Sequence, residues 1–279
     1  MTQSSITSPS ITLPSIAAPR YIYVHSSAQL SEHLQRVYFS SDDFSDFPLG
    51  QNGAHIKLFF PEHAHQKPPL PLRNEHGRVI WPDGKKPLTR TYSIRDFLAE
   101  QQLLVIDFVR HADFGIAADW AIHAQPGDTL GLAGPGGPSR FNPQAKYWVF
   151  IADLSALAML AASLEQLPTD AHGEVWIELE NAADRIELIY PAAMQIHWLI
   201  NSPDVEQQIA CSLEQLDWDA QQISVTLAGE NSRVVALRRM IKEKYRLHKD
   251  DLYAVPYWKK GHSEEAYHQQ RHQVMDQDI

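Results

Sequence analysis

The segment Arg90-Thr91-Tyr92-Ser93 carries side chains that could hold a flavin. It lies in a run of strand-forming residues, in which successive side chains point to opposite faces, so Arg90 and Tyr92 share one face. On that face a guanidinium can bind a pyrophosphate while the phenol ring packs on an isoalloxazine or ribityl group. Ser93, or its backbone amide, could hydrogen-bond near flavin N5, the atom that receives hydride. Taken alone, however, such a segment is more often an ordinary edge strand with an exposed arginine.

A second segment, Asp107-Phe-Val-Arg-His111, ends a strand and leads into a short helix. The side chains of Asp107, Val109 and His111 alternate onto one face of that strand. Gly115 then opens a helix predicted over about 117–122, whose N-terminal amides could bind a phosphate. The residues at this helix start that could border a cofactor are Ala117, Ala118 and Trp120. The plainer alternatives are a strand-end histidine at position 111 and a tryptophan that only packs in the core.

The first half of the chain has the rhythm of a small antiparallel barrel. Short runs rich in β-branched and aromatic residues are bounded by Gly, Pro and Asp, with one short helix among them. The predicted strands are 21–24, 36–40, 54–60, 89–94, 103–110 and 128–133. A proline-rich excursion over 61–87 reads as a long surface connection between two of them. The sequence leaves open whether this excursion gates the site.

The second half alternates strands with helices, a pattern typical of an open parallel sheet in a nucleotide-binding type of domain. The predicted strands are 147–152, 174–179, 197–200, 222–228 and 252–255, and the predicted helices are 155–167, 203–216 and 232–245. We expect a mobile tail over 1–19, the barrel over 20–142 and the α/β domain over 143–260. A C-terminal helix and tail then fill 261–279, with Ser263 as the helix N-cap.

Composition narrows the possible functions. A formal net charge of -10 disfavours a general nucleic-acid binder, which needs a broad cationic surface. The single cysteine, Cys211, cannot form an intramolecular disulfide or hold an iron-sulfur cluster alone. The chain shows neither a signal-peptide pattern nor a long apolar run. We therefore expect a cytoplasmic protein that binds neither membrane nor nucleic acid, and nothing in the sequence demands more than a monomer.

Taken together and in order, the motifs make a specific pattern. The chain contains four further motifs besides Arg90–Ser93 and Asp107–His111. They are Gly115-Ile-Ala-Ala-Asp-Trp-Ala121, Gly134-Pro-Gly-Gly-Pro138, Leu227-Ala-Gly-Glu230 and Tyr257-Trp-Lys-Lys-Gly261. The chain resembles the siderophore-interacting protein family from about Tyr21 to His268. The resemblance implies ferric-siderophore reductases built on the ferredoxin-NADP reductase architecture, a barrel plus an α/β domain.

By this resemblance, the segment Arg90 to Ser93, Thr91 included, binds FAD, and Ser93 is the candidate catalytic residue. Asp107, Val109 and His111 would line the same site. The helix start departs from the family pattern, because Ile116 replaces a proline and Ala118 replaces a serine. One hydroxyl contact to phosphate is thereby lost, but backbone amides remain. We therefore expect FAD binding to survive.

The α/β half departs further from the family. Its first strand is followed by Ala152-Asp-Leu-Ser-Ala-Leu-Ala158, which retains the acidic and hydroxyl positions, Asp153 and Ser155, but lacks the family's glycine and glutamate. Glu230 follows a later strand and precedes a helix, the position at which α/β domains bind ligands. It could equally be a carboxylate that favours the helix dipole. The electron donor, NADH, NADPH or reduced ferredoxin, therefore stays open.

The family architecture would gather a small basic cluster around the open face of the flavin. Its members are Lys57, Arg140, Lys259 and Lys260. Such a cluster would attract an anionic ferric siderophore, although each residue alone could be a solvated surface charge. We expect no metal ligated by the protein, and His63 and His65 fit solvated loop positions. The rival functions are a general flavin or ferredoxin-linked oxidoreductase and a non-enzymatic siderophore-binding protein.

Overall fold

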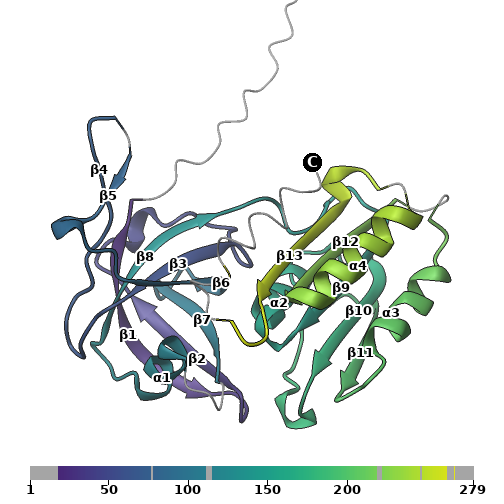
Figure 1. Cartoon of the computed structure of the whole chain (residues 1–279), viewed down its shortest axis with the longest axis horizontal. Helices are drawn as coiled ribbons and strands as arrows, with labels where there is room; N and C mark the ends of the chain where they lie inside the picture. Colours follow the sequence, from purple (N-terminus) through teal and green to yellow (C-terminus); the bar gives the residue numbers. More distant parts are fainter. Residues whose placement is uncertain are drawn as a thin grey trace, which may run out of the picture.

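The structure, a computed structural model, describes residues 18–76, 78–110, 115–218, 222–245, 247–262 and 267. It contains a closed barrel followed along the chain by a five-stranded sheet (Figure 1). This arrangement confirms the predicted fold class. Among the described residues, no helix has the length and apolar character needed to cross a membrane.

The barrel is antiparallel, with the strand order β1-β2-β7-β6-β3-β8. Its strands are β1 (Arg20–Gln29), β2 (Leu34–Ser40), β3 (His55–Phe60), β6 (Leu88–Leu98), β7 (Leu103–Val109) and β8 (Thr129–Gly136). Alternate apolar side chains fill the interior, among them Val37, Leu58 and Ile106, each 0% exposed. Helix α1 (Ile116–His123) packs on this core through Ala117, Ala121 and Trp120.

The excursion predicted over 61–87 holds a short hairpin of β4 (Leu72–Arg73) and β5 (Val79–Ile80) and a 3-10 turn, η2 (Pro82–Gly84). Its apolar side chains Leu72, Val79 and Ile80 are exposed. Figure 1 shows the hairpin on the side of the barrel away from the second sheet. The excursion is therefore a surface segment, as the sequence predicts.

The second sheet is wholly parallel, in the order β11-β10-β9-β12-β13. Its strands are β9 (Tyr147–Asp153), β10 (His172–Leu179), β11 (Ala193–Ile200), β12 (Ile223–Glu230) and β13 (Leu252–Trp258). The strand order reverses direction between β9 and β12. In open α/β sheets, ligands bind at such a switch point, outside the carboxyl ends of the strands.

Helices cover both faces of this sheet. On one face α3 (Val205–Glu214) and α4 (Asn231–Lys244) share a core with the strands. On the other lies α2 (Leu157–Leu164), which follows the 3-10 turn η3 (Leu154–Ala156) and is buried at every position. Its outer side contacts β6 of the barrel. The mostly apolar sequence of α2, whose one serine, Ser163, donates its hydroxyl to the Met159 carbonyl, therefore reflects burial between two layers.

Several polar contacts join the barrel to the sheet layer, among them those of Asp184 and Arg95. In the β1–β2 turn, Ser31 Oγ donates to Asp184 Oδ1 at 2.6 Å and His33 Nδ1 lies 2.8 Å from Asp184 Oδ2. Asp184 lies in the 3-10 turn η4 (Ala182–Asp184), and its side chain is 2% exposed. In β6, Arg95 forms a two-pronged ion pair with Glu165 at the end of α2, at 2.6 and 3.1 Å.

Most of the predicted N-terminal tail and C-terminal helix, with its N-cap Ser263, lies outside the described residues. The exception at the C-terminal end is Tyr267, which is buried. Its hydroxyl donates a hydrogen bond of 2.6 Å to Asn231 Oδ1 at the start of α4. Tyr267 thus attaches the end of the chain to the second sheet layer.

Candidate functional site

Strand β6 presents the Arg90–Ser93 segment with the alternation that the sequence predicts. Tyr92 is half-buried and packs on Phe108, with 4.5 Å between ring centroids. Arg90, on the same face, is half-buried and donates from Nη1 to the Thr89 carbonyl at 3.0 Å. Ser93 is buried, and its Oγ lies 3.4 Å from the hydroxyl of Tyr257 in the second sheet. The serine therefore marks the junction between the two sheets.

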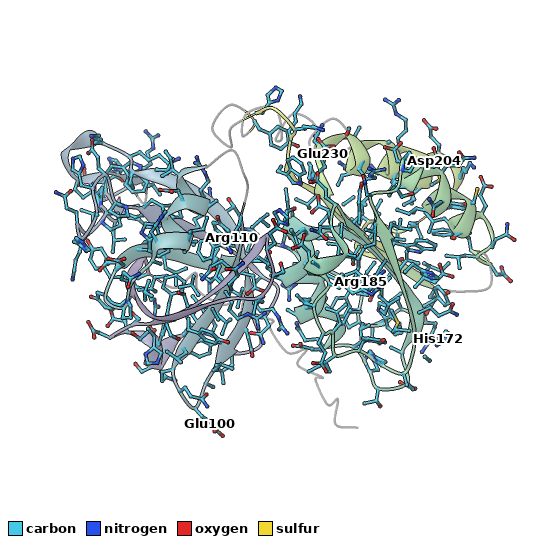
Figure 2. All side chains as sticks on the ribbon, turned by 90° about the horizontal axis from the view of Figure 1, so that it is seen from below. Glu100, Arg110, His172, Arg185, Asp204 and Glu230 are labelled. Carbon is cyan, nitrogen blue, oxygen red and sulfur yellow. The ribbon has the colours of Figure 1, made fainter. Side chains whose placement is uncertain are left out.

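A diphosphate group would find suitable donors at the end of β7. Nη1 of Arg110 is buried and has no hydrogen-bond partner among the residues that the structure describes, and Figure 2 shows Arg110 on the side of the barrel that faces the second sheet. Helix α1 begins shortly afterwards. Its N-cap residue is Gly115, so no side chain caps the amides of the first turn. An unpartnered guanidinium and uncapped helix amides suit an anion. These donors and the Tyr92 ring fit the binding of FAD.

Three predicted helix residues contribute packing. Ala117 and Ala118 are buried, so their backbone amides are what they can offer to a ligand. Trp120 stacks on Phe39, with 6.2 Å between ring centroids and an interplanar angle of 9°. His111, the remaining prediction in this region, lies outside the described residues.

The carboxylate of Asp107 is occupied by the barrel itself. Arg36, its direct cross-strand partner on β2, donates to it from Nε at 2.7 Å and from Nη2 at 2.8 Å. Burial alone would lower the pKa of Arg36, but the hydrogen bonds and the charge of Asp107 outweigh it and raise the pKa. Val109, two residues further along, packs against the core of the second sheet layer. The structure thus assigns Asp107 and Val109 contacts that stabilise the barrel and the junction beside the candidate flavin site.

At the switch point, Asp153 ties three strand ends together. Its carboxylate accepts hydrogen bonds from the Ser155 amide at 2.9 Å, the Ser155 hydroxyl at 2.5 Å and the Glu230 amide at 2.8 Å. Trp258 Nε1 adds a fourth at 2.7 Å. Burial raises the pKa of Asp153, and these hydrogen bonds offset the effect only in part. Asp153 and Ser155 thus lie together at the carboxyl edge of the second sheet.

Glu230 lies beside Asp153 and caps α4. Its carboxylate accepts from the Ser232 amide at 2.6 Å, from the Lys260 amide at 3.2 Å and from the Ser232 hydroxyl. Burial would raise the pKa of Glu230, but these hydrogen bonds outweigh it and leave the pKa below its usual range. Lys260 therefore reaches the switch point through its backbone, while its side chain is exposed.

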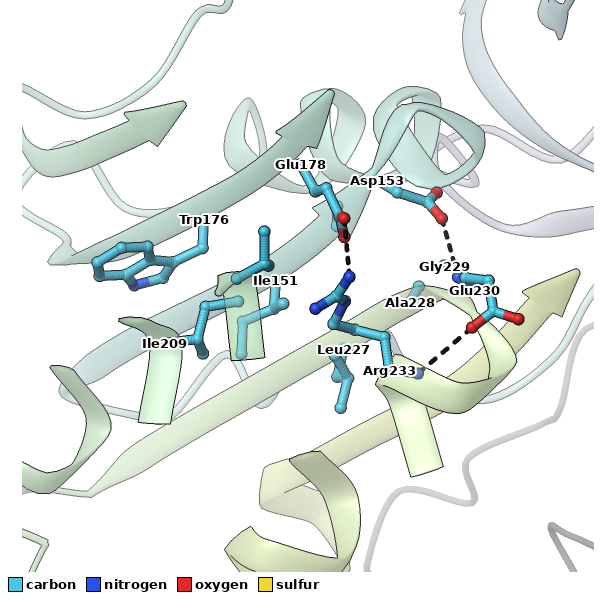
Figure 3. A pocket seen from close by; sticks show the side chains of 12 residues that line it. Ile151, Asp153, Trp176, Glu178, Ile209, Leu227, Ala228, Gly229, Glu230 and Arg233 are labelled. Carbon is cyan, nitrogen blue, oxygen red and sulfur yellow. Dashed lines mark hydrogen bonds and ion pairs between the residues drawn. The ribbon is translucent and has the colours of Figure 1, made fainter. Parts of the chain in front are cut away.

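A small pocket opens between the strand ends and the two helices α3 and α4 (Figure 3). Arg233 of α4 crosses it and donates to Glu178 Oε1 at 2.8 Å. Burial raises the pKa of Glu178, against the lowering effect of Arg233. The pocket walls are Ile151, Ala152, Asp153, Trp176, Glu178, Val205, Ile209, Leu227, Ala228, Gly229, Glu230 and Arg233. Its position is where a nucleotide would approach this type of sheet.

The predicted basic residues occupy different environments. Lys57 is exposed on β3 and lies directly across from Thr91, on the barrel face that Thr91 shares with Ser93. Arg140 is half-buried and donates from Nη2 to the Asn52 carbonyl at 3.1 Å. Lys259 is half-buried and follows β13. Lys57 therefore lies beside the candidate flavin segment, whereas Arg140 lies inside the junction.

Comparison with known proteins decides the family. The model described as "Siderophore-interacting FAD-binding domain" matches residues 23–139. The model described as "Siderophore-interacting protein" matches residues 145–261. The chain belongs to the siderophore-interacting protein family. The resemblance stated from the motifs is thereby confirmed.

Relatives in this family align over most of the chain. The ferric vibriobactin reductase ViuB of Vibrio cholerae is 40% identical over 264 residues, 94% of this chain and 97% of that protein. The NADPH-dependent ferric-chelate reductase of Escherichia coli is 31% identical over 78% of this chain and 84% of its own. The crystal structure of the siderophore-interacting protein SipS from Aeromonas hydrophila superposes with a TM-score of 0.78 at 33% identity, covering 93% of this chain and 98% of that one.

Two residues of this siderophore-interacting protein escaped the sequence-based assignment of roles. Arg110 stands inside the Asp107–His111 motif, so its position next to the predicted helix start could have identified it. Tyr257 belongs to a quoted motif, but its contact with Ser93 joins positions 164 residues apart. No local pattern predicts such a contact. Both residues lie where the barrel meets the second sheet.

Proposed function

We propose that this protein is an FAD-dependent ferric-siderophore reductase that takes electrons from a nicotinamide nucleotide. The observation that carries the proposal is the placement of Lys57 directly across from Thr91, on the barrel face that also presents Ser93. A basic residue for an anionic substrate thus lies next to the segment suited to the flavin. The fold and the relatives named as ferric reductases support the same function.

In this proposal each group in the barrel has a separate task. Arg90, Arg110 and the amides at the start of α1 hold the diphosphate. The Tyr92 ring, fixed by Phe108, packs on the flavin, and Ser93 donates a hydrogen bond near N5. FAD supplies the conversion of a hydride into single electrons. The protein provides position, charge and exclusion of water.

The ferric siderophore is the substrate, and the protein need not ligate its iron. Within the described part of the chain, no group of three or more His, Cys, Asp or Glu side chains could hold a metal ion. Lys57 and Lys259 would attract an anionic complex such as a ferric catecholate. Fe(II) is less highly charged than Fe(III), and hard oxygen ligands hold it less tightly. Reduction therefore releases the iron.

The donor nucleotide would approach the switch point, beside Asp153, Ser155 and Glu230. Because their side chains already bond to one another and to backbone amides, they shape this edge, and the Arg233 guanidinium beside it is paired with Glu178 and Glu206. We propose NADH or NADPH as donor, with reduced ferredoxin as the alternative. We further propose domain limits of 20–142 and 143–260, a monomeric protein and a cytoplasmic location.

The test is ferrous iron capture by purified protein under anaerobic conditions. The protein, saturated with FAD, is mixed with NADH, NADPH or reduced ferredoxin, a ferric catecholate siderophore and a ferrous chelator. We expect catalytic Fe(II) formation with at least one donor. Flavin reduction without Fe(II) formation from any ferric chelate would favour a general flavin reductase. Siderophore binding by a protein that takes up no FAD would favour a non-enzymatic carrier.

A further inference from the structure

Within the part of the chain that the structure describes, Arg140 is a cation in the junction without a partner of opposite charge. It follows β8 by four residues. Among the described residues, its guanidinium donates one hydrogen bond, from Nη2 to the Asn52 carbonyl at 3.1 Å. Its Nε is buried and has no hydrogen-bond partner in that part of the chain. Within the same described part, no carboxylate forms an ion pair with it. The backbone is fixed as well, because the Thr226 hydroxyl donates to the Arg140 carbonyl at 2.6 Å.

Such a placement opposes the charge on the guanidinium. Burial lowers the pKa of Arg140, and the phenols of Tyr253 and Tyr257 offset the effect in part. An arginine nevertheless keeps its proton in proteins, so the positive charge persists in the junction. A partly buried charge is less favourable than a fully solvated one unless an opposite charge compensates it. The missing compensation points to an anion that the polypeptide does not supply.

Two observations relate the position of this charge to the Ser93 end of β6. Tyr257, whose electrostatic influence reaches Arg140, places its hydroxyl 3.4 Å from Ser93 Oγ. Gly53 donates its amide to the Ile94 carbonyl at 2.7 Å, and a Cβ at Gly53 would lie 3.4 Å from Arg140 Nε. The guanidinium therefore lies behind the residues that we assign to the N5 end of the flavin.

We propose that Arg140 stabilises the negative charge of the reduced flavin, instead of binding the ferric siderophore. The inference rests on the proposed function. Hydride transfer to the neutral oxidised ring adds two electrons and one proton at N5, and leaves one negative charge. Transfer of one electron to each of two Fe(III) ions, with loss of the N5 proton to solvent, returns the ring to neutrality. A fixed cation favours the reduced form and so raises the flavin reduction potential.

The test compares the flavin midpoint potential of the FAD-loaded wild type with that of Arg140→Gln and Arg140→Lys, by equilibration with reference dyes. In Arg140→Gln we expect reduced FAD to bind at least tenfold more weakly relative to oxidised FAD. For a two-electron couple this is a fall of about 30 mV. Arg140→Lys, which keeps the charge, should recover most of the potential. Lys57→Ala is the matched control, and it should raise the KM for a ferric catecholate without moving the potential.

An unchanged potential in Arg140→Gln would overturn the inference, and an accompanying rise in KM would assign Arg140 to the substrate. Because the potential needs no ferric substrate, the proposed function can fail while this inference stands. A wild-type measurement serves if Arg140→Gln does not fold: a spectral pH titration of the reduced protein. The bound reduced ring should lose its proton at a lower pKa than free reduced FAD. An equal or higher pKa, or a protein that binds no FAD, would also overturn the inference.

Discussion

At the scale of single residues, positive charge around the candidate flavin site is distributed among side chains with different surroundings. Arg90 lies on β6 and Arg110 directly follows the neighbouring strand β7, and Nη1 of Arg110 is buried and has no hydrogen-bond partner among the described residues. Lys57 is exposed on the adjacent strand. Buried guanidinium groups suit a cofactor that stays bound, while an exposed ammonium suits a substrate that must leave. Two substitutions separate these roles.

Arg90→Ala should weaken FAD binding by about 10- to 100-fold, because hydrogen bonds to charged groups contribute roughly 1.5–3 kcal/mol. Titration of the apoprotein with FAD, followed by flavin fluorescence, measures the Kd. Arg239→Ala, which removes an exposed arginine of α4, is the control and should leave the Kd unchanged. If Arg90→Ala bound FAD within twofold of the wild type, Arg90 would not contact the cofactor.

Lys57→Ala should raise the KM for an anionic ferric catecholate about two- to fivefold at low salt, which is the effect of an exposed charge pair. The difference should shrink as salt screens the attraction. Steady-state Fe(II) formation at several ionic strengths measures it. Lys146→Ala, at the amino end of the second sheet, is the matched control. A KM that Lys57→Ala leaves unchanged at low salt would remove Lys57 from the substrate site.

Residue roles could be predicted as far as local spacing reaches. Strand alternation correctly placed Arg90 and Tyr92 on one face. The same reasoning found Asp107 but not its partner Arg36, because strand register depends on pairing between distant segments. Likewise, Arg140 could be predicted as a basic residue, whereas its position inside the junction depends on how the two sheets meet.

At the scale of elements, the carboxyl ends of β9, β12 and β13 form one hydrogen-bonded edge through Asp153. A glycine makes this edge possible. Gly229 has φ +145°, and a Cβ there would come within 2.7 Å of the Asp153 carboxylate. Both the backbone conformation and the space therefore require glycine at this position.

Gly229→Ala should lower the free energy of unfolding by about 1–3 kcal/mol from backbone strain, with a further loss from displacing Asp153. Thermal and denaturant unfolding measure the change. Gly50→Ala is the control, because Gly50 also has positive φ, +69°, but a Cβ there meets nothing within 4 Å. Equal losses in the two variants would show that the contact with Asp153 adds nothing.

Alternating strands and helices correctly predicted the parallel sheet, while element boundaries needed the structure. The helix predicted over 155–167 begins as a 3-10 turn, because the Asp153 side chain binds the Ser155 amide, and α2 proper covers Leu157–Leu164. Strand β11 begins at Ala193, four residues before its predicted start at 197. Its early residues are held by parallel pairing with β10, which periodicity alone does not reveal.

At the scale of the whole molecule, function depends on how the barrel meets the second sheet. Asp184, buried beside Ser31 and His33, joins the two layers. Burial would raise its pKa, but hydrogen bonds from Ser31 and His33 outweigh it and leave the pKa below its usual range. An acid with a lowered native pKa stabilises the fold above its unfolded pKa, about 3.9 for Asp, and loses that effect as the pH falls through the native value.

Asp184→Ala should therefore unfold at a lower temperature than the wild type at pH 7, and the difference should shrink as the pH falls below about 4. Melting curves across this range measure the effect. Asp170→Ala, at an exposed position, is the control and should melt like the wild type. A difference in Tm that does not change with pH would mean that the ionised Asp184 carboxylate does not stabilise the junction.

The sequence revealed the two architectures more readily than their junction. The predicted helix over 155–167 gave no sign that α2 lies buried between two layers, and the Asp184 contacts join residues about 150 positions apart. The change from closely spaced strands to alternating strands and helices supplied the order of the two halves. The geometry between them came from the structure, and it places Tyr257 against Ser93.

The most direct measurement is a single turnover between the reduced protein and a ferric siderophore. FAD-loaded protein is reduced anaerobically, freed of excess donor and mixed with a ferric catecholate complex in the presence of a ferrous chelator. We expect the flavin absorbance to return while two Fe(II) ions are captured for each flavin oxidised. A flavin that stays reduced with every ferric chelate, or a protein that binds no FAD, would contradict the assignment as a ferric-siderophore reductase.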